Sequence, residues 1–192
     1  MSGFRRVAER PVHDGHIWRV VVADFEAPDG HTFERDIVRS PGAVGVVPLV
    51  FDAEGNASVI LVRQYRPAFD RDLLEIPAGM RDVDGEAPEE TARRELIEEA
   101  GLAAGQLDLL IELRPSPGMT DAVTAVYLAT DCTAAERSLQ GPEEEHSVLV
   151  HLPLEDAVEA VAAGEITDAK TVVGVLLTDR RVRAGDHRGD DG

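Results

Sequence analysis

The sequence predicts an α/β fold in which a largely β core is accompanied by a few helices. Runs in which apolar and polar residues alternate, joined by turn residues, indicate strands. Later segments repeat apolar residues every three or four positions, which is typical of amphipathic helices. The chain has 192 residues, which suits one domain, or one domain with a small appendage. Hydrophobic residues make up 43% of the chain, which is enough to fill a core.

Strands are expected mainly in the first two thirds of the chain. Residues 17–39 are predicted to form a hairpin around the turn APDG, and residues 43–51 and 58–65 a second pair around DAEGN. The later runs LDLLIELRPSPG and AVTAVYLAT are typical of further strands, and the charged loop EEEH leads into another. We therefore expect an N-terminal β-hairpin followed by a mixed α/β domain.

Helices are expected over three segments, residues 88–100, 154–163 and 168–180. In the first, Pro88 suits the opening turn, and Glu89 and Glu90 complement the positive end of the helix dipole. Gly101 stands where a C-terminal glycine belongs. The residues from 183 to 192 are expected to form a disordered tail.

The composition limits the partners of the chain. Its net charge of −18 disfavours nucleic acid and anionic membranes, because both require a basic surface. No run approaches the roughly 20 apolar residues of a membrane span, and the N-terminus does not resemble a signal peptide, so a cytoplasmic location is expected. The single Cys132 cannot form an internal disulfide. One lysine, Lys170, stands among 19 basic residues, and we interpret the excess of arginine as a codon bias.

The segment ARRELIEEAGL, residues 92–102, places three carboxylates close together on the first predicted helix. Glu95 and Glu99 lie one turn apart, with Glu98 beside them. Repulsion between such carboxylates costs only a few tenths of a kcal/mol per pair, so helix stability does not decide their purpose. A separate apolar stripe can pack on the sheet: Ala92, Leu96 and Ala100.

Two interpretations of these carboxylates stay open at this point. Most charge clusters are solvated helix faces, and Arg94 can pair with Glu98 four residues on. A cluster of oxygen ligands without His or Cys instead indicates Mg²⁺, Mn²⁺ or Ca²⁺ rather than Zn²⁺.

The flanks of the helix favour the metal site. PAGMRDVDGEAPEETARRELIEEAGL, residues 77–102, resembles the signature of the Nudix hydrolases. Glu86 is followed after seven residues by the run from Arg94 to Leu102, in which every fixed position of the signature matches. Six residues separate Gly79 from Glu86, whereas the usual pattern has five, which implies a loop one residue longer before the helix.

The resemblance implies a fold, a domain organisation and a metal site. The fold is the Nudix-type α/β/α sandwich around a mixed β-sheet. Residues 1–42 are the N-terminal β-hairpin region, residues 43–182 the Nudix hydrolase domain, and residues 183–192 the tail. The ion is Mg²⁺, with Mn²⁺ as the alternative. Its implied ligands are the carbonyl of Ala78 and the carboxylates of Glu95, Glu98 and Glu99, with Glu98 also counted among the catalytic residues.

Three further stretches resemble the ADP-ribose pyrophosphatases. They are VRQYRP at residues 62–67, SPGMTD at residues 116–121 and GEITDAKTVVGVLL at residues 164–177. The implied reaction is hydrolysis of ADP-ribose, or a related nucleoside diphosphate sugar, to AMP and ribose 5-phosphate. Ala122 departs from these enzymes, which commonly have Glu there. The alternatives are another nucleoside diphosphate derivative, such as GDP-mannose or a dinucleotide, and a sensor that binds ADP-ribose without cleaving it.

The same resemblance implies substrate-binding residues. Arg63 and Arg66 are candidates for holding phosphates as forked donors, with surface ion pairs as the alternative. Met119, in the loop SPGMTD, is a further candidate. Trp18 is a candidate for stacking on a base, with a role in the core or at a dimer interface as the alternative.

The resemblance also implies a general base and an assembly. Related enzymes carry a catalytic Glu in the loop GPEEEH. Alignment on Pro153 points to Glu144, with Glu143 next and Glu145 as a solvated neighbour. A homodimer built through residues 17–39 is expected, because an unpaired hairpin leaves an exposed edge.

Overall fold

The computed structural model describes residues 3–186, apart from the side chain of Glu143. The chain forms two compact units. The N-terminal unit comprises the residues up to Gly42 together with Arg114–Val123, and the main unit comprises Ala43–Leu113 and the residues from Thr124 onwards. No helix in the described residues is long and apolar enough to cross a membrane.

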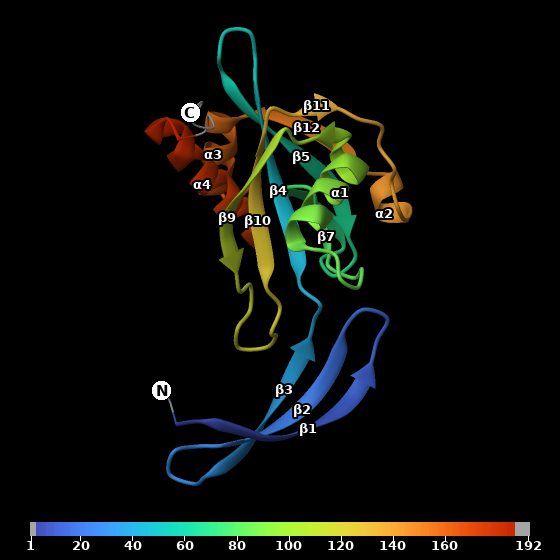
Figure 1. Cartoon of the computed structure of the whole chain (residues 1–192), viewed down its shortest axis with the longest axis vertical. Coiled ribbons are helices and arrows are strands. Elements are labelled where there is room, and N and C mark those ends of the chain that lie inside the picture. Colours follow the sequence, from blue (N-terminus) through green and yellow to red (C-terminus); the bar gives the residue numbers. More distant parts are fainter. Residues whose placement is uncertain (1–2, 187–192) are drawn as a thin grey trace. The chain divides into compact units, whose positions relative to one another are not determined.

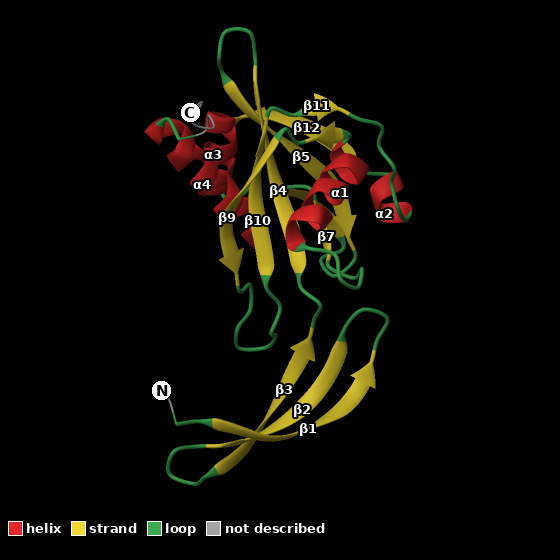
Figure 2. Ribbon diagram, viewed as in Figure 1, coloured by secondary structure: helices red, strands yellow, loops and turns green. Residues whose placement is uncertain are grey.

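The N-terminal unit is a three-stranded antiparallel sheet in the order β1-β2-β3 (Figure 2). Its strands are β1 (Arg5–Asp14), β2 (Arg19–Glu26) and β3 (Thr32–Arg39). The predicted hairpin at residues 17–39 corresponds to β2 and β3, and β1 adds a third strand to it that was not predicted. β1 was missed because all ten of its residues are exposed, so its sequence carries no alternation of apolar and polar residues.

The loop at residues 114–123 belongs to this unit because its backbone is hydrogen-bonded to β3. Val38 N–H donates to the Met119 carbonyl at 2.9 Å. The Thr120 hydroxyl donates to the Val38 carbonyl at 2.7 Å. These bonds attach SPGMTD to the edge of the sheet, a long-range contact that no local pattern predicts.

The main unit is built around a seven-stranded mixed sheet in the order β12-β5-β4-β10-β9, with β6 paired to β5 and β7 to β4. β4 and β10 run parallel, and the other pairs run antiparallel. The strands are β4 (Ala43–Phe51), β5 (Ala57–Arg66), β6 (Arg71–Glu75), β7 (Ala78–Met80), β9 (Gln106–Leu113), β10 (Thr124–Thr130) and β12 (Val148–Pro153). A separate two-stranded sheet joins β8 (Leu102–Ala103) to β11 (Thr133–Ala134).

Four helices complete the main unit: α1 (Pro88–Ala100), α2 (Pro142–Glu145), α3 (Leu154–Ala162) and α4 (Ala169–Ala184). The predicted helices at residues 88–100, 154–163 and 168–180 are confirmed as α1, α3 and α4. α4 continues through Ala184, past the expected start of the tail, whereas residues 187–192 lie outside the described residues. The segment expected as a charged loop contains the short helix α2, opened by Pro142.

α1 lies on one side of the sheet, and α3 and α4 lie on the other (Figure 1). An apolar cluster fills each of the two interfaces, which confirms the α/β/α sandwich. On one face the stripe Ala92, Leu96 and Ala100 of α1 packs on the sheet. Leu96 is fully buried, which stabilises the fold by about 2 kcal/mol. On the other face α3 and α4 pack against side chains of β4 and β10: Val47, Leu49, Val126 and Leu128.

α4 approaches the sheet closely because Gly174 lacks a side chain. A Cβ placed there would lie 2.7 Å from Cγ2 of Val47. At the start of the helix, Asp168 is the N-cap and accepts the Thr171 N–H at 3.0 Å. The Thr171 hydroxyl accepts the Ile76 N–H at 2.9 Å, which ties the helix to the connection between β6 and β7.

A charge network buried beside this connection centres on Glu75, which is 2% exposed. Arg66 donates to both of its oxygens at 2.6 and 2.7 Å, and the Lys170 ammonium also donates to it. Lys170 pairs in addition with Asp168 at 3.0 Å. Burial alone would raise the pKa of Glu75, but the hydrogen bonds from Arg66 and the charge of Lys170 outweigh it and lower the pKa to about 2.

We expect Glu75 to make folding stability depend on pH in the acid range. Its pKa is about 2 in the folded chain and 4.5 in the unfolded chain, so stability present above pH 4.5 is lost as the pH falls towards 2. A difference of this size corresponds to about 3 kcal/mol. Urea denaturation at pH 7 and pH 3 measures the loss.

Glu75→Gln is expected to weaken this pH dependence and to lower the free energy of unfolding at pH 7 by about 3 kcal/mol, because Arg66 and Lys170 lose a buried counter-charge. Glu159→Gln, at an exposed site on α3, is the control and keeps the wild-type profile. Equal acid slopes for wild type and Glu75→Gln would contradict the assignment.

Candidate active site

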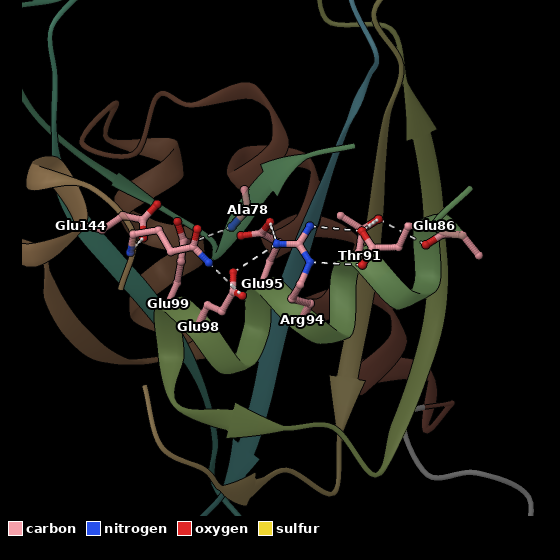
Figure 3. A network of polar contacts seen from close by, with 10 residues as sticks. Ala78, Glu86, Thr91, Arg94, Glu95, Glu98, Glu99 and Glu144 are labelled. Carbon is pink, nitrogen blue, oxygen red and sulfur yellow. Dashed lines mark hydrogen bonds and ion pairs between the residues drawn. The ribbon is translucent and has the colours of Figure 1, made fainter. Parts of the chain in front are cut away.

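Glu95 and Glu99 of α1 lie against the start of β7, and Glu98 lies beside them on the helix (Figure 3). Glu99 is 3% exposed and Glu95 is 8% exposed, whereas Glu98 is half-buried. The Ala78 N–H donates to Oε2 of Glu99 at 2.9 Å, so the backbone at Ala78 lies directly against this face of the helix. Sequence spacing therefore predicted correctly that the three side chains lie together.

Gly79 explains how the turn comes so close to α1. A Cβ at this position would lie 2.1 Å from the carboxylate carbon of Glu95, far inside van der Waals contact. Any larger residue in this position of β7 would require the carboxylate of Glu95 to move. The glycine of the signature thus has a steric reason in this chain.

Arg94 links the carboxylates to one another. Its Nη1 donates to Glu95 at 2.7 Å and to Glu98 at 3.1 Å, which confirms the predicted pair with Glu98. Its Nε and Nη2 donate to the two oxygens of Glu86 at 3.1 Å each. Thr91 also donates to Glu86 at 2.8 Å. Glu86 therefore lies at the N-terminal side of the cluster as the anchor of Arg94.

Burial disfavours the ionised forms of Glu95 and Glu99. Burial raises the pKa of Glu95 to about 7, although the charge of Arg94 acts in the opposite direction. Burial also raises the pKa of Glu99 to about 8, against the hydrogen bond from Ala78 and with the added repulsion of Glu144. A cation placed here would favour the ionised form of both groups.

Glu144 approaches the same cluster from α2 (Figure 3). Its carboxylate accepts the Gln140 N–H at 2.6 Å, which holds the side chain over its own loop. The Gln140 side chain donates to Glu98 at 3.2 Å and connects the loop with α1. Glu145 is exposed, and the side chain of Glu143 lies outside the described residues. Gln140 was missed because a polar residue in a polar loop carries no sequence signal.

The residues present suit a divalent cation that shares its coordination shell with a substrate. The donors are carboxylate and carbonyl oxygens, the set that Mg²⁺ and Mn²⁺ prefer. Within residues 3–186, no three acidic, His or Cys side chains already form a group that could hold a metal ion. Mg²⁺ commonly keeps water or phosphate oxygens in its shell, so it does not require a closed protein cage.

Arg63 and Arg66 are not brought together. Arg66 forms the bidentate pair with Glu75, and Glu99 is among the charges that influence its pKa, so it lies near the carboxylate cluster. Arg63 instead lines a cavity of 520 Å³ with residues of β6, β12 and α3, such as Asp72 and Glu159. α3 packs on the sheet face opposite α1, so Arg63 faces away from the cluster.

Trp18 and Met119 both belong to the N-terminal unit. Trp18 is 52% exposed at the turn between β1 and β2 and lines an apolar pocket with His13 and Ile17, so it is not a core residue of this chain. Met119 is 54% exposed and lines a pocket with Phe25 and residues of β3.

Comparisons with known proteins agree with this geometry. The chain matches the NUDIX domain family over residues 39–182. It is 36% identical over 171 residues to an ADP-ribose pyrophosphatase of Bacillus subtilis (strain 168), covering 89% of this chain and 90% of that protein. It is 35% identical to an ADP-ribose pyrophosphatase of Mycobacterium tuberculosis (strain ATCC 25618 / H37Rv), covering 90% of this chain and 82% of that protein.

A solved structure described as an ADP compounds hydrolase superposes with a TM-score of 0.80. Its sequence identity is 24%, and the match covers 96% of this chain and 97% of that chain, which establishes the shared fold. The family match covers most of the chain and includes the acidic face of α1, Gly79 and Arg94. The chain belongs to the Nudix family.

Proposed function

We propose that the chain hydrolyses the pyrophosphate bond of ADP-ribose, or of a closely related nucleoside diphosphate sugar, to AMP and ribose 5-phosphate. The observation that carries the proposal is the pair of buried carboxylates Glu95 and Glu99 against the Ala78 turn. Two relatives named ADP-ribose pyrophosphatases, similar over most of the chain, support this choice of substrate.

In this proposal the acidic face of α1 holds the cation. Glu95, Glu98, Glu99 and the Ala78 carbonyl are its protein ligands, with Mg²⁺ as the ion and Mn²⁺ as the alternative. The bound ion supplies charge neutralisation at the phosphates and lowers the pKa of the attacking water. Nη1 of Arg66, which has no hydrogen-bond partner among the described residues, donates to a phosphate oxygen.

Glu144 is the proposed general base. It accepts a proton from the water as the new P–O bond forms and the P–O bond of the pyrophosphate breaks, so one phosphate stays with AMP and the other with ribose. Its place beside Glu98 and Glu99, on a loop linked to α1 by Gln140, supports this role.

Purified protein with Mg²⁺ and ADP-ribose is expected to release AMP and ribose 5-phosphate, and chelation is expected to stop the reaction. In Glu98→Gln/Glu99→Gln we expect kcat to fall at least about a hundredfold, because the ion loses two charged ligands. Product chromatography measures both effects. Glu89→Gln, an exposed position on α1, is the matched control. Retained turnover in the double variant would rule out this metal site.

The same assay tests the substrate. Ala122, where the resemblance to the ADP-ribose pyrophosphatases implies Glu, is the feature that favours a shifted preference. Faster turnover of GDP-mannose or a dinucleotide than of ADP-ribose would select that alternative. Binding of ADP-ribose without turnover at any divalent ion would select the sensor.

Glu144→Gln tests the base. We expect kcat to fall by about a hundredfold to ten-thousandfold, because the variant cannot accept the proton. Glu145→Gln changes the adjacent, exposed residue and is expected to keep wild-type kcat. Stopped or continuous assays at saturating substrate measure both variants. Equal effects at the two positions would contradict the assignment.

We also propose a homodimer formed through the N-terminal sheet. β1 is an edge strand whose residues are all exposed, including Val7 at 50% and Val12 at 58%. Such an edge favours pairing with a second copy. Light scattering is expected to give twice the 20.7 kDa chain mass, and Val7→Glu/Val12→Glu is expected to shift the mass towards one chain. A wild-type mass of one chain would exclude the dimer.

A cytoplasmic location stays a prediction.

A further inference from the structure

Lys170 is the only lysine of the chain, and the structure gives it a defined place that composition did not suggest. It lies in the first turn of α4, and its side chain is only 15% exposed. Its ammonium lies between the carboxylates of Glu75 and Asp168. Asp168 is already fixed as the N-cap of α4, so it holds the ammonium at a defined point of the helix.

Glu75 connects Lys170 to Arg66, because its carboxylate accepts hydrogen bonds from both. One of its oxygens accepts Nε of Arg66, and the other accepts both Nη2 of Arg66 and the ammonium of Lys170. With Lys170 in place, the carboxylate has little freedom to rotate, so the plane of the guanidinium is set as well. Two positive and two negative charges balance in this network, which limits the cost of burying them.

The hydrogen bonds to Glu75 leave the Nη1 group of Arg66 for a ligand. Over the described residues, Nη1 of Arg66 makes no hydrogen bond or ion pair, whereas Nε and Nη2 are both used by Glu75. The side chain as a whole is 37% exposed, so part of it is open to a ligand. Glu99 is among the charges that act on Arg66, which places the guanidinium near the acidic face of α1.

The same helix end also fixes the turn that carries Ala78. The Ile76 N–H donates to the Thr171 hydroxyl, and the Val46 N–H donates to the Pro77 carbonyl at 2.8 Å. Ala78 N–H in turn contacts Glu99. The first turn of α4, on one sheet face, and α1, on the other, therefore meet at residues 75–78.

We propose that Lys170 is a positioning residue for substrate binding: through Glu75 it holds Arg66 so that Nη1 takes a phosphate oxygen of a nucleoside diphosphate. The inference rests on the proposed function for its substrate and on the contacts above for its geometry. A competing explanation is that the ion pair only stabilises the fold. The two differ in whether the effect of Lys170 depends on Arg66.

A double-mutant cycle separates these explanations. Lys170→Met keeps the stem of the side chain and removes the charge, and we expect kcat/KM for ADP-ribose to fall about tenfold to a hundredfold, since the phosphate contact is misplaced. In Arg66→Ala the same change is expected to have less than about a twofold effect, because the group that Lys170 positions is absent. Lys170→Arg restores the charge and is expected to recover most of the loss. Equal losses from Lys170→Met with and without Arg66 would overturn the proposal.

A second measurement does not depend on activity. In a ¹H–¹⁵N spectrum, the Nε–H resonance of Arg66, assigned by its loss in Arg66→Ala, reports the pair with Glu75. We expect Lys170→Met to shift or broaden it. Arg183→Met, which removes an exposed cation of α4 paired with Asp179, is the matched control and is expected to leave it unchanged. An unmoved resonance in Lys170→Met would overturn the proposal.

The two readouts separate this inference from the proposed function. If the wild type cleaves no nucleoside diphosphate derivative, the proposed function fails and the Arg66 resonance alone decides the positioning by Lys170. If the wild type is active and Lys170→Met keeps wild-type kcat/KM, the proposed function stands and the role of Lys170 is wrong.

Discussion

The main unit depends on one electrostatic constraint, the burial of two carboxylates one turn apart on α1. Glu95 and Glu99 are nearly inaccessible to water, yet each receives only one hydrogen bond from the described residues. Burying such charges costs several kcal/mol per ion unless they are compensated. The raised pKa values of both groups express this cost. The fold therefore concentrates carboxyl groups at this point, and the divalent cation proposed to bind there would favour their ionised forms.

The surrounding architecture keeps this arrangement from relaxing. The apolar stripe of α1 is anchored in one core cluster, so the helix cannot rotate its carboxylates towards water without exposing Leu96. Gly79 allows the turn to approach the acidic face, and the hydrogen bond between Val46 and Pro77 fixes the turn to the sheet. Packing and hydrogen bonds thus supply the free energy that holds the like charges together.

Local patterns predicted the parts of the site that depend on nearby residues. The limits of α1, its apolar stripe and the pair between Arg94 and Glu98 all follow from spacings of a few residues. The exposed strand β1 does not, because it lacks an alternating pattern. The pair between Lys170 and Glu75 does not either, because 95 positions separate the two residues in the sequence. Arg63 and Arg66, three positions apart on one strand, were grouped as phosphate ligands. The structure places Arg63 at a different cavity and gives Arg66 a buried counter-ion.

Arg94 on α1 and Arg66 on β5 differ in how many of their guanidinium nitrogens already donate to carboxylates of the protein. All three guanidinium nitrogens of Arg94 donate to carboxylates of the same cluster, so Arg94 compensates charge within the protein. Two of these bonds go to Glu86, which keeps its place beside Arg94 although the loop from Gly79 is one residue longer than usual. Arg66 uses Nε and Nη2 for a single carboxylate, and its Nη1 makes no hydrogen bond within residues 3–186. The number of partners on each guanidinium therefore distinguishes Arg94, which compensates charge within the protein, from Arg66, for which substrate binding is proposed.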